Sequence, residues 1–261
     1  MDNFPITFGT YRIITKEDIY NGLDMALSKG IRHIDTAELY KNHHLIGEVL
    51  PKLLDKYQLR RADIKITSKI SFKKLLLPDE DIIRAINQIY EDLKIDYIDT
   101  ILIHAPTTDE NNKRIWKLLS QYREKSINNI GVSNFRYEHI ESLNNYIKEN
   151  NLRNIYINQI ELNPFVLSRQ QKLVEYCKEN NILISLYGLF YHFDKYDKPF
   201  KRNHLIEWTK YHNFIPNIKT LDKECLDEIL YNKKDGLYID YMNQIPFVKE
   251  TGFQFTKYNT N

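Results

Sequence analysis

Four side chains near the ends of apolar runs have the chemistry needed to pass a proton to a carbonyl oxygen. Asp35, Lys69 and His104 each close a short apolar run, and Tyr40 follows Asp35 by five positions. A phenol with a reference pKa of about 10 is a weak acid at neutral pH, but a neighbouring ammonium can lower that pKa by roughly 1–3. We expect Lys69 to lower the pKa of Tyr40, Asp35 to keep Lys69 charged and oriented, and His104 to donate to the carbonyl oxygen.

Eight short runs rich in Ile, Val, Thr and Tyr must carry these side chains, and they have the length and composition of buried strands. The runs cover residues 8–11, 31–35, 64–69, 97–104, 127–132, 155–160, 182–187 and 214–219. Apolar residues at helical spacing recur between them, at residues 16–28, 79–93, 115–122, 137–148, 168–178, 201–212 and 222–231. Strands and helices that alternate about every 30 residues predict a parallel sheet.

The length of the chain favours closure of that sheet. A (β/α)8 barrel takes about 250 residues, and this chain has 261. A doubly wound open sheet shares the same alternation, but no glycines are spaced as in G-x-G-x-x-G or a P-loop. We therefore predict a single-domain α/β fold, a (β/α)8 TIM barrel over residues 1–261, with a variable tail from about residue 232.

Polar side chains also end the later strands, and a barrel would bring them to the same mouth as the first four. These residues are Ser133, Asn134, Gln159, Tyr187, Lys219 and Thr220. In a barrel all strand carboxyl ends open on one face, which carries the active site. Because burial of unpaired polar groups is costly, such a concentration indicates a functional site. Taken singly, Asp35 would more often be a turn or cap residue, His104 a core histidine and Lys69 a solvated charge.

The composition argues against several other classes of function. The net charge is +2, with 37 basic and 35 acidic residues interspersed, so we expect neither nucleic acid nor membrane as a partner. Only two cysteines are present, and the start of the chain lacks a signal peptide pattern, which predicts a cytoplasmic protein. The pair His43 and His44 has no metal-binding partners in the sequence, so we interpret it as a solvated helix start and predict no metal site.

Six segments, taken in order, resemble the aldo-keto reductase family. They are residues 8–11 (FGTY), 30–40 (GIRHIDTAELY), 67–69 (TSK), 102–106 (LIHAP), 130–135 (IGVSNF) and 158–164 (NQIELNP). Each segment alone is weak evidence, but six in register are specific. The similarity extends from near residue 6 to about residue 220.

The resemblance implies a barrel that reduces a small-molecule aldehyde or ketone with NADP(H), held without a Rossmann fold. It implies a catalytic set of Asp35, Tyr40, Lys69 and His104, with Tyr40 as the general acid. The cofactor-binding residues that it implies are Gly9, Thr10, Tyr11, Asp35, Ser133, Asn134, Gln159, Tyr187, Lys219 and Thr220. The substrate-binding residues that it implies are Tyr11, Tyr40, Ser71, Phe72, His104 and Ala105.

The chain departs from the family pattern at both ends of the implied site. Cys225 stands where an arginine usually grips the 2′-phosphate, although Lys223 lies nearby, so NAD(H) is the alternative cofactor. Ser71 and Ala105 stand where the family has tryptophans, and Gly188 where it has serine. We therefore expect a wider pocket, or one filled from elsewhere by Phe72, Phe190, Phe247, Phe253 or Phe255.

Two classes of function remain open from the sequence. The first is a reductase, which the complete set of four reactive residues favours. The second is a barrel that has lost catalysis and acts as a cofactor-binding regulatory or interaction subunit. The departures from the family pattern at the phosphate-binding and substrate-binding positions are compatible with this second class. The expected oligomeric state is a monomer or a weak oligomer.

Overall fold

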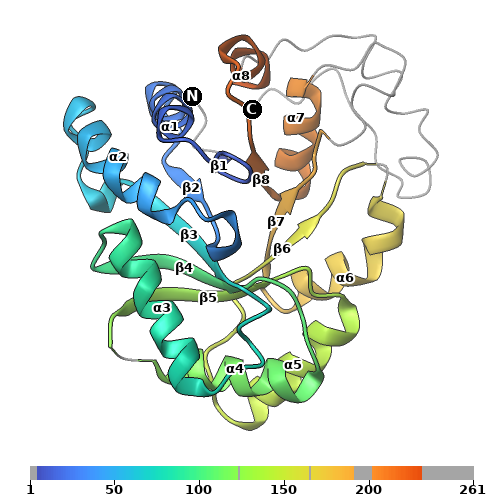
Figure 1. Cartoon of the computed structure of the whole chain (residues 1–261). Helices are drawn as coiled ribbons and strands as arrows, with labels where there is room; N and C mark the ends of the chain where they lie inside the picture. Colours follow the sequence, from blue (N-terminus) through green and yellow to red (C-terminus); the bar gives the residue numbers. More distant parts are fainter. Residues whose placement is uncertain (1–4, 123, 165, 191–201, 231–261) are drawn as a thin grey trace.

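Eight parallel strands close into a barrel, as predicted (Figure 1). The computed structural model describes residues 5–122, 124–164, 166–190 and 202–230. The strands are β1 (Thr7–Gly9), β2 (His33–Asp35), β3 (Lys65–Ile70), β4 (Tyr97–Ile103), β5 (Ser126–Ser133), β6 (Ile157–Glu161), β7 (Leu183–Tyr187) and β8 (Ile215–Ile218). Each strand pairs with the next along the chain, and β8 pairs with β1. All carboxyl ends of the strands therefore open on one mouth.

Helices surround the barrel and alternate with the strands (Figure 1). They are α1 (Lys16–Ser28), α2 (His43–Lys56), α3 (Asp79–Leu93), α4 (Asp109–Gln121), α5 (Tyr137–Glu149), α6 (Leu167–Glu179), α7 (Arg202–His212) and α8 (Lys223–Leu230). Short 3-10 turns η1 (Glu38–Tyr40) and η2 (Arg61–Asp63) complete the order. Within the described ranges, no helix combines the length and the apolar character needed to cross a membrane.

The differences from the predicted elements have local causes. The sequence predicted only the start of α2, at His43 and His44, and not its extent. Pro51 lies inside the helix, where a proline removes a backbone donor and weakens the helical signal. Helix α4 begins at Asp109, six residues before the first of the apolar residues that indicated it, because the hydroxyl of Thr108 accepts a hydrogen bond from the amide of Asn111 and caps its start.

Branched aliphatic residues fill the layer between the barrel and its helices. Ile19, Leu23, Ile46, Ile82 and Ile86 are fully buried in this layer. At Gly47 in α2, a methyl group would lie 2.1 Å from the carbonyl oxygen of Asp92, so only glycine allows α2 and α3 to approach this closely. This packing fixes α2 and the turn η1 that precedes it.

Two histidines bond to hydroxyl groups on the barrel strands. The ring of His33 lies between the hydroxyls of Thr7 and Thr67, at 3.1 and 2.8 Å. His43 begins α2, as expected for a helix start, but it is buried rather than solvated, and its Nε2 lies 2.9 Å from the hydroxyl of Ser68. The adjacent His44 is exposed, so the interpretation of the pair as solvated holds only for His44.

We predict that replacing His43 with glutamine reduces the loss of stability in acid. Burial lowers the pKa of His43 from 6.5 to about 4. Between those values the unfolded chain binds a proton that the folded protein does not, so the free energy of unfolding falls as the pH drops from 6.5 to 4. A buried neutral histidine can account for on the order of 1–3 kcal/mol of this loss.

Urea unfolding at pH 7, 5.5 and 4.5 measures the effect. His44→Gln is the control, because its side chain is exposed. If His43→Gln and wild-type protein lose equal stability over this range, the account of His43 is wrong.

Candidate active site

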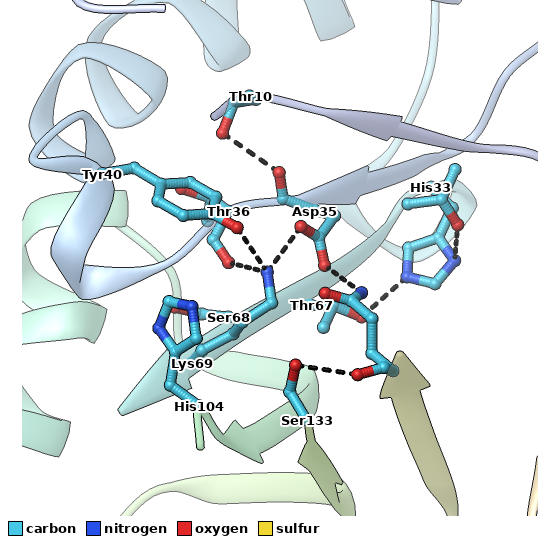
Figure 2. A network of polar contacts seen from close by, with 12 residues as sticks. Thr10, His33, Asp35, Thr36, Tyr40, Thr67, Ser68, Lys69, His104 and Ser133 are labelled. Carbon is cyan, nitrogen blue, oxygen red and sulfur yellow. Dashed lines mark hydrogen bonds and ion pairs between the residues drawn. The ribbon is translucent and has the colours of Figure 1, made fainter. Parts of the chain in front are cut away.

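The carboxyl ends of β2 and β3 bring an aspartate and a lysine into direct contact inside the barrel. Nζ of Lys69 lies 2.6 Å from Oδ1 of Asp35, and both side chains are 1% exposed. The same ammonium donates to the carbonyl oxygen of Thr36 at 3.0 Å and to the hydroxyl of Tyr40 at 3.2 Å (Figure 2). All three hydrogens of the ammonium therefore have an acceptor.

The position of Tyr40 follows from the turn that joins β2 to α2. Glu38–Tyr40 forms η1, in which the amide of Tyr40 donates to the carbonyl of Ala37 at 2.9 Å. Lys41 then adopts a left-handed conformation with φ of 57° and redirects the chain into α2. This turn points the phenol back toward Lys69 on β3.

Burial and the ion pair act on Lys69 in opposite directions. Burial lowers the pKa of the Lys69 ammonium, while the charge and hydrogen bond of Asp35 raise it. Removing one partner of such a pair leaves an uncompensated buried charge, which is far more costly than removing both. The stability of the fold therefore requires Asp35 and Lys69 to be present together, whatever their role in a reaction.

The expectation that Lys69 lowers the pKa of Tyr40 is wrong for this structure. Burial raises the pKa of the Tyr40 phenol above its usual value of 10.0, and the negative charge of Asp35 raises it further. The positive charge of Lys69 is already matched by Asp35 at 2.6 Å, so little of it remains to favour a phenolate. Tyr40 thus keeps its proton at neutral pH.

His104 lies beside Tyr40 as a neutral ring. The two rings meet edge to face with centroids 5.9 Å apart. Burial, with the positive charge of Lys69, lowers the pKa of His104 from 6.5 to about 4. Its Nδ1 is buried without a hydrogen-bond partner among the described residues. A neutral imidazole in this position can donate one hydrogen bond to a polar group that enters the mouth.

The predicted cofactor-binding residues of the later strands form a continuous network that ends at Asp35. Nε2 of Gln159 donates to Oδ2 of Asp35 at 2.8 Å, and the hydroxyl of Ser133 donates to the backbone oxygen of Gln159 at 2.9 Å. Nδ2 of Asn134 lies 3.1 Å from the Ser133 hydroxyl, and its Oδ1 accepts from the Tyr187 hydroxyl at 2.6 Å. The hydrogen bond from the Tyr187 hydroxyl to Asn134 therefore orients the half-buried ring of Tyr187.

The residues predicted after β1 have separate surroundings. A methyl group at Gly9 would lie 2.4 Å from Oδ1 of Asn217, so a larger residue there would displace that side chain of β8. The Thr10 hydroxyl donates to the backbone oxygen of Asp35 at 3.0 Å. Tyr11 is 51% exposed at the mouth, with its ring centroid 5.0 Å from that of Tyr40.

The structure does not join Lys219 and Thr220 to this network. They follow β8, and Thr220 bonds only to Asp222 among the hydrogen bonds of the described residues. Oδ1 of Asp222 accepts from the amides of Glu224 and Cys225 at 2.8 and 3.3 Å. A carboxylate therefore already occupies the first amides of α8.

The predicted substrate-binding residues surround the mouth to different depths. Ser71 is buried, and its amide donates to Oε2 of Glu38 at 3.0 Å. Phe72 is 40% exposed, while Ala105 and Phe190 are half-buried. Phe247, Phe253 and Phe255 lie outside the described residues.

Two further residues hold this region and were missed by the sequence analysis. Glu38 binds the Ser71 amide and forms an ion pair with Lys74, which ties the β3–α3 loop to η1. Asn42 is fully buried and bonds to the loops after β1 and β2. Glutamate and asparagine are common in exposed loops. A single sequence therefore carries no signal that distinguishes these two residues from exposed loop residues.

A cavity of about 930 Å³ opens at the opposite mouth, among the amino ends of the strands. Its walls include His33, Lys65, Asn129 and Ile157, but none of the four reactive residues. The candidate active site is therefore the mouth at the carboxyl ends, where the reactive groups converge, and not this cavity.

Known proteins resemble this chain in sequence and in fold. The model of the Aldo/keto reductase family matches residues 5–199. The chain belongs to the aldo/keto reductase family. Dihydrodiol dehydrogenase 3 from Bos taurus is 30% identical over 204 residues, which cover 69% of this chain and 61% of the bovine protein. D/L-glyceraldehyde reductase from Hypocrea jecorina is 31% identical over 207 residues, which cover 71% of this chain and 60% of the fungal protein.

A solved structure shows the same fold. The aldo-keto reductase of Bombyx mori, in complex with NADP, superposes with a TM-score of 0.73 at 20% sequence identity, covering 95% of this chain and 93% of the silkworm protein. The chain thus spans about three fifths of the two curated relatives named here.

We predict strong coupling between Asp35 and Lys69 in stability. Lys69→Met leaves the Asp35 carboxylate buried with Gln159 as its remaining side-chain donor, so it should lower the free energy of unfolding by about 3–5 kcal/mol. The double variant Asp35→Asn, Lys69→Met removes both charges and should lose less than the two single variants together. Urea unfolding of the four proteins gives the coupling energy.

Lys113→Met serves as the control, because Lys113 pairs with Asp109 on the surface of α4. Its expected cost is about 0.5 kcal/mol or less. Additive losses for Asp35→Asn and Lys69→Met would show that the buried pair is not a unit.

Proposed function

We propose that this protein reduces aldehydes or ketones to alcohols at the carboxyl mouth of the barrel. The observation that carries the proposal is the contact of a protonated phenol, Tyr40, with the buried Lys69–Asp35 pair, beside the neutral ring of His104. A reduced nicotinamide cofactor, when bound, supplies a hydride to the carbonyl carbon. The electron pair of the broken C=O π bond moves to oxygen, which then takes the proton from Tyr40.

The raised pKa of Tyr40 fits a donor of this kind. A carbonyl oxygen is barely basic before reduction, so a phenol that holds its proton does not lose it early. As the oxygen becomes an alkoxide it is more basic than the phenol, and the proton moves to it. Lys69, held by Asp35, then lies 3.2 Å from the oxygen of Tyr40 that gains negative charge and stabilises it. His104 would orient the carbonyl oxygen with its one N–H group.

The donors and acceptors at the ends of β5, β6 and β7 suit the nicotinamide part of the cofactor. Ser133, Asn134 and Gln159 offer hydroxyl and amide groups to a carboxamide, and the Tyr187 ring is fixed by its bond to Asn134. We assign NADP(H) as the cofactor, in line with the family and with the NADP complex of the silkworm protein. The alternative is NAD(H), because Cys225 offers no positive charge and the Asp222 carboxylate occupies the start of α8.

The proposed substrate is a small-molecule carbonyl compound. The name of the fungal relative, a glyceraldehyde reductase, supports a small aldehyde, and Ser71 and Ala105 leave room for a wider one. We further propose a cytoplasmic monomer or weak oligomer that binds neither nucleic acid nor membrane. No observation on the described residues favours the alternative of a regulatory subunit without catalysis.

We predict that Tyr40→Phe lowers kcat for reduction by about 10²–10⁴-fold, because it removes the proton donor while keeping the ring. Binding of NADPH should remain within about threefold of wild type, since the phenol hydroxyl is not among the groups proposed to hold the cofactor. Oxidation of NADPH with glyceraldehyde and with p-nitrobenzaldehyde measures turnover, and calorimetric titration measures NADPH and NADH binding.

Tyr57→Phe is the matched control, because its hydroxyl bonds to Asp24 on the outer helices. A Tyr40→Phe protein that turns over at the wild-type rate would contradict the mechanism. If the wild-type protein binds NADH but not NADPH, the proposed reductase activity stands and the cofactor is NAD(H). If it binds neither, the alternative of a regulatory subunit is favoured.

A further inference from the structure

Asn42 is a buried polar residue that the chemistry does not use directly. It is fully buried and lies two positions after Tyr40, at the N-cap of α2. Asparagine at this position usually caps the helix with its side chain, yet Asn42 makes no such bond. Its side chain bonds to two loops of the active-site mouth instead.

The side chain of Asn42 uses both its donor and its acceptor. Oδ1 accepts from the Thr36 hydroxyl at 2.8 Å. Nδ2 donates to the backbone oxygens of Thr10 and Ile13 at 2.9 and 3.0 Å. Because the two backbone oxygens can only accept, the amide nitrogen must face them and the oxygen must face Thr36. Neither aspartate nor leucine could make this set of bonds.

The first branch leads to Lys69. Thr36, which Asn42 holds by its hydroxyl, presents its backbone oxygen to Nζ of Lys69 at 3.0 Å. The amide of Thr36 donates to the backbone oxygen of Thr67 at 2.9 Å. Thr36 is thus fixed by its side chain, its amide and its carbonyl, and rotation of this peptide would remove one of the three acceptors of the ammonium.

The second branch leads to Asp35. Thr10, whose backbone oxygen accepts from Asn42, donates to the backbone oxygen of Asp35 with both its amide and its hydroxyl, each at 3.0 Å. The loop after β1 is therefore held against the loop after β2 at the residues that flank the ion pair. Tyr11, between Thr10 and Ile13, lies against the ring of Tyr40.

We propose that Asn42 is a positioning residue, which holds the Thr36 carbonyl and the Tyr40 turn in the geometry that Lys69 requires. The inference rests on the proposed function, because it concerns the same proton donor. Displacement of reacting groups by about 1 Å can cost about 100-fold in rate. Loss of Asn42 should therefore act on the chemical step more than on binding.

The test compares four variants. Asn42→Ala removes the whole set of bonds, Thr36→Val removes only the hydroxyl, and Thr36→Ser keeps that hydroxyl. Asn144→Ala is the matched control, because Asn144 is a buried amide that joins α5 to α6 through Tyr176 and Asn180, away from the mouth. If Asn42→Ala fails to fold, Thr36→Val tests the first branch with a side chain of nearly the same shape.

We expect kcat to fall about 10- to 100-fold in Asn42→Ala and in Thr36→Val, with KM for p-nitrobenzaldehyde and Kd for NADPH within about twofold. Thr36→Ser should recover most of the loss, and Asn144→Ala should lose stability but keep kcat. Wild-type kcat in Asn42→Ala and Thr36→Val would overturn the proposal. So would a loss of kcat in Asn144→Ala as large as that in Asn42→Ala.

Amide hydrogen exchange separates this inference from the proposed function. The amides of Thr36 and Tyr40, which donate to Thr67 and Ala37, should exchange faster in Asn42→Ala than in wild-type protein, while Asn144→Ala leaves them unchanged. If wild-type protein shows no turnover, the proposed function fails and the exchange rates still decide the role of Asn42. Unchanged exchange at both amides would overturn that role.

Discussion

The burial of an ammonium beside a carboxylate is the constraint on which this mouth of the barrel depends. Lys69 and Asp35 are removed from water, so the loss of hydration must be offset by their mutual attraction and by hydrogen bonds to every remaining donor and acceptor. Gln159 serves the second carboxylate oxygen, and the Thr36 carbonyl and the Tyr40 hydroxyl serve the other hydrogens of the ammonium. The requirements of the pair therefore set the positions of residues from β2, β3, β6 and η1.

The pair also sets the electrostatics of its neighbours. Because the two charges of the pair nearly cancel, the pair does little to favour ionisation of the groups beside it. The charged forms of these buried groups would also lack the hydration that they have in water. Burial is the main cause of both pKa shifts: it raises the pKa of Tyr40 and lowers that of His104 to about 4. Both groups are therefore neutral hydrogen-bond donors at neutral pH, and the only charges buried in the cluster belong to the pair itself. Such a site can supply a proton to an oxygen that becomes basic during a reaction.

Much of this arrangement could be predicted from the sequence, because parallel strands deliver their carboxyl ends to one mouth. Asp35, Lys69 and His104 end successive apolar runs, so their convergence follows from the barrel. The direction of the Tyr40 pKa could not be predicted, because it depends on burial and on the 2.6 Å contact between Lys69 and Asp35. Asn42 and the burial of His43 were missed because their partners are loop backbone oxygens and Ser68 of β3, which are distant in the sequence.

The protonation state of Lys69 tests this account most directly. The ¹⁵N chemical shift of its side chain, assigned by the signal lost in Lys69→Met and followed from pH 6 to 9 in ¹⁵N-lysine-labelled protein, distinguishes an ammonium from an amine. The account predicts an ammonium at pH 7: burial lowers the pKa of Lys69 overall, but the charge and the hydrogen bond of Asp35 oppose that shift. An amine at pH 7 would contradict it, since a neutral Lys69 could not stabilise the charge that Tyr40 gains when it gives up its proton.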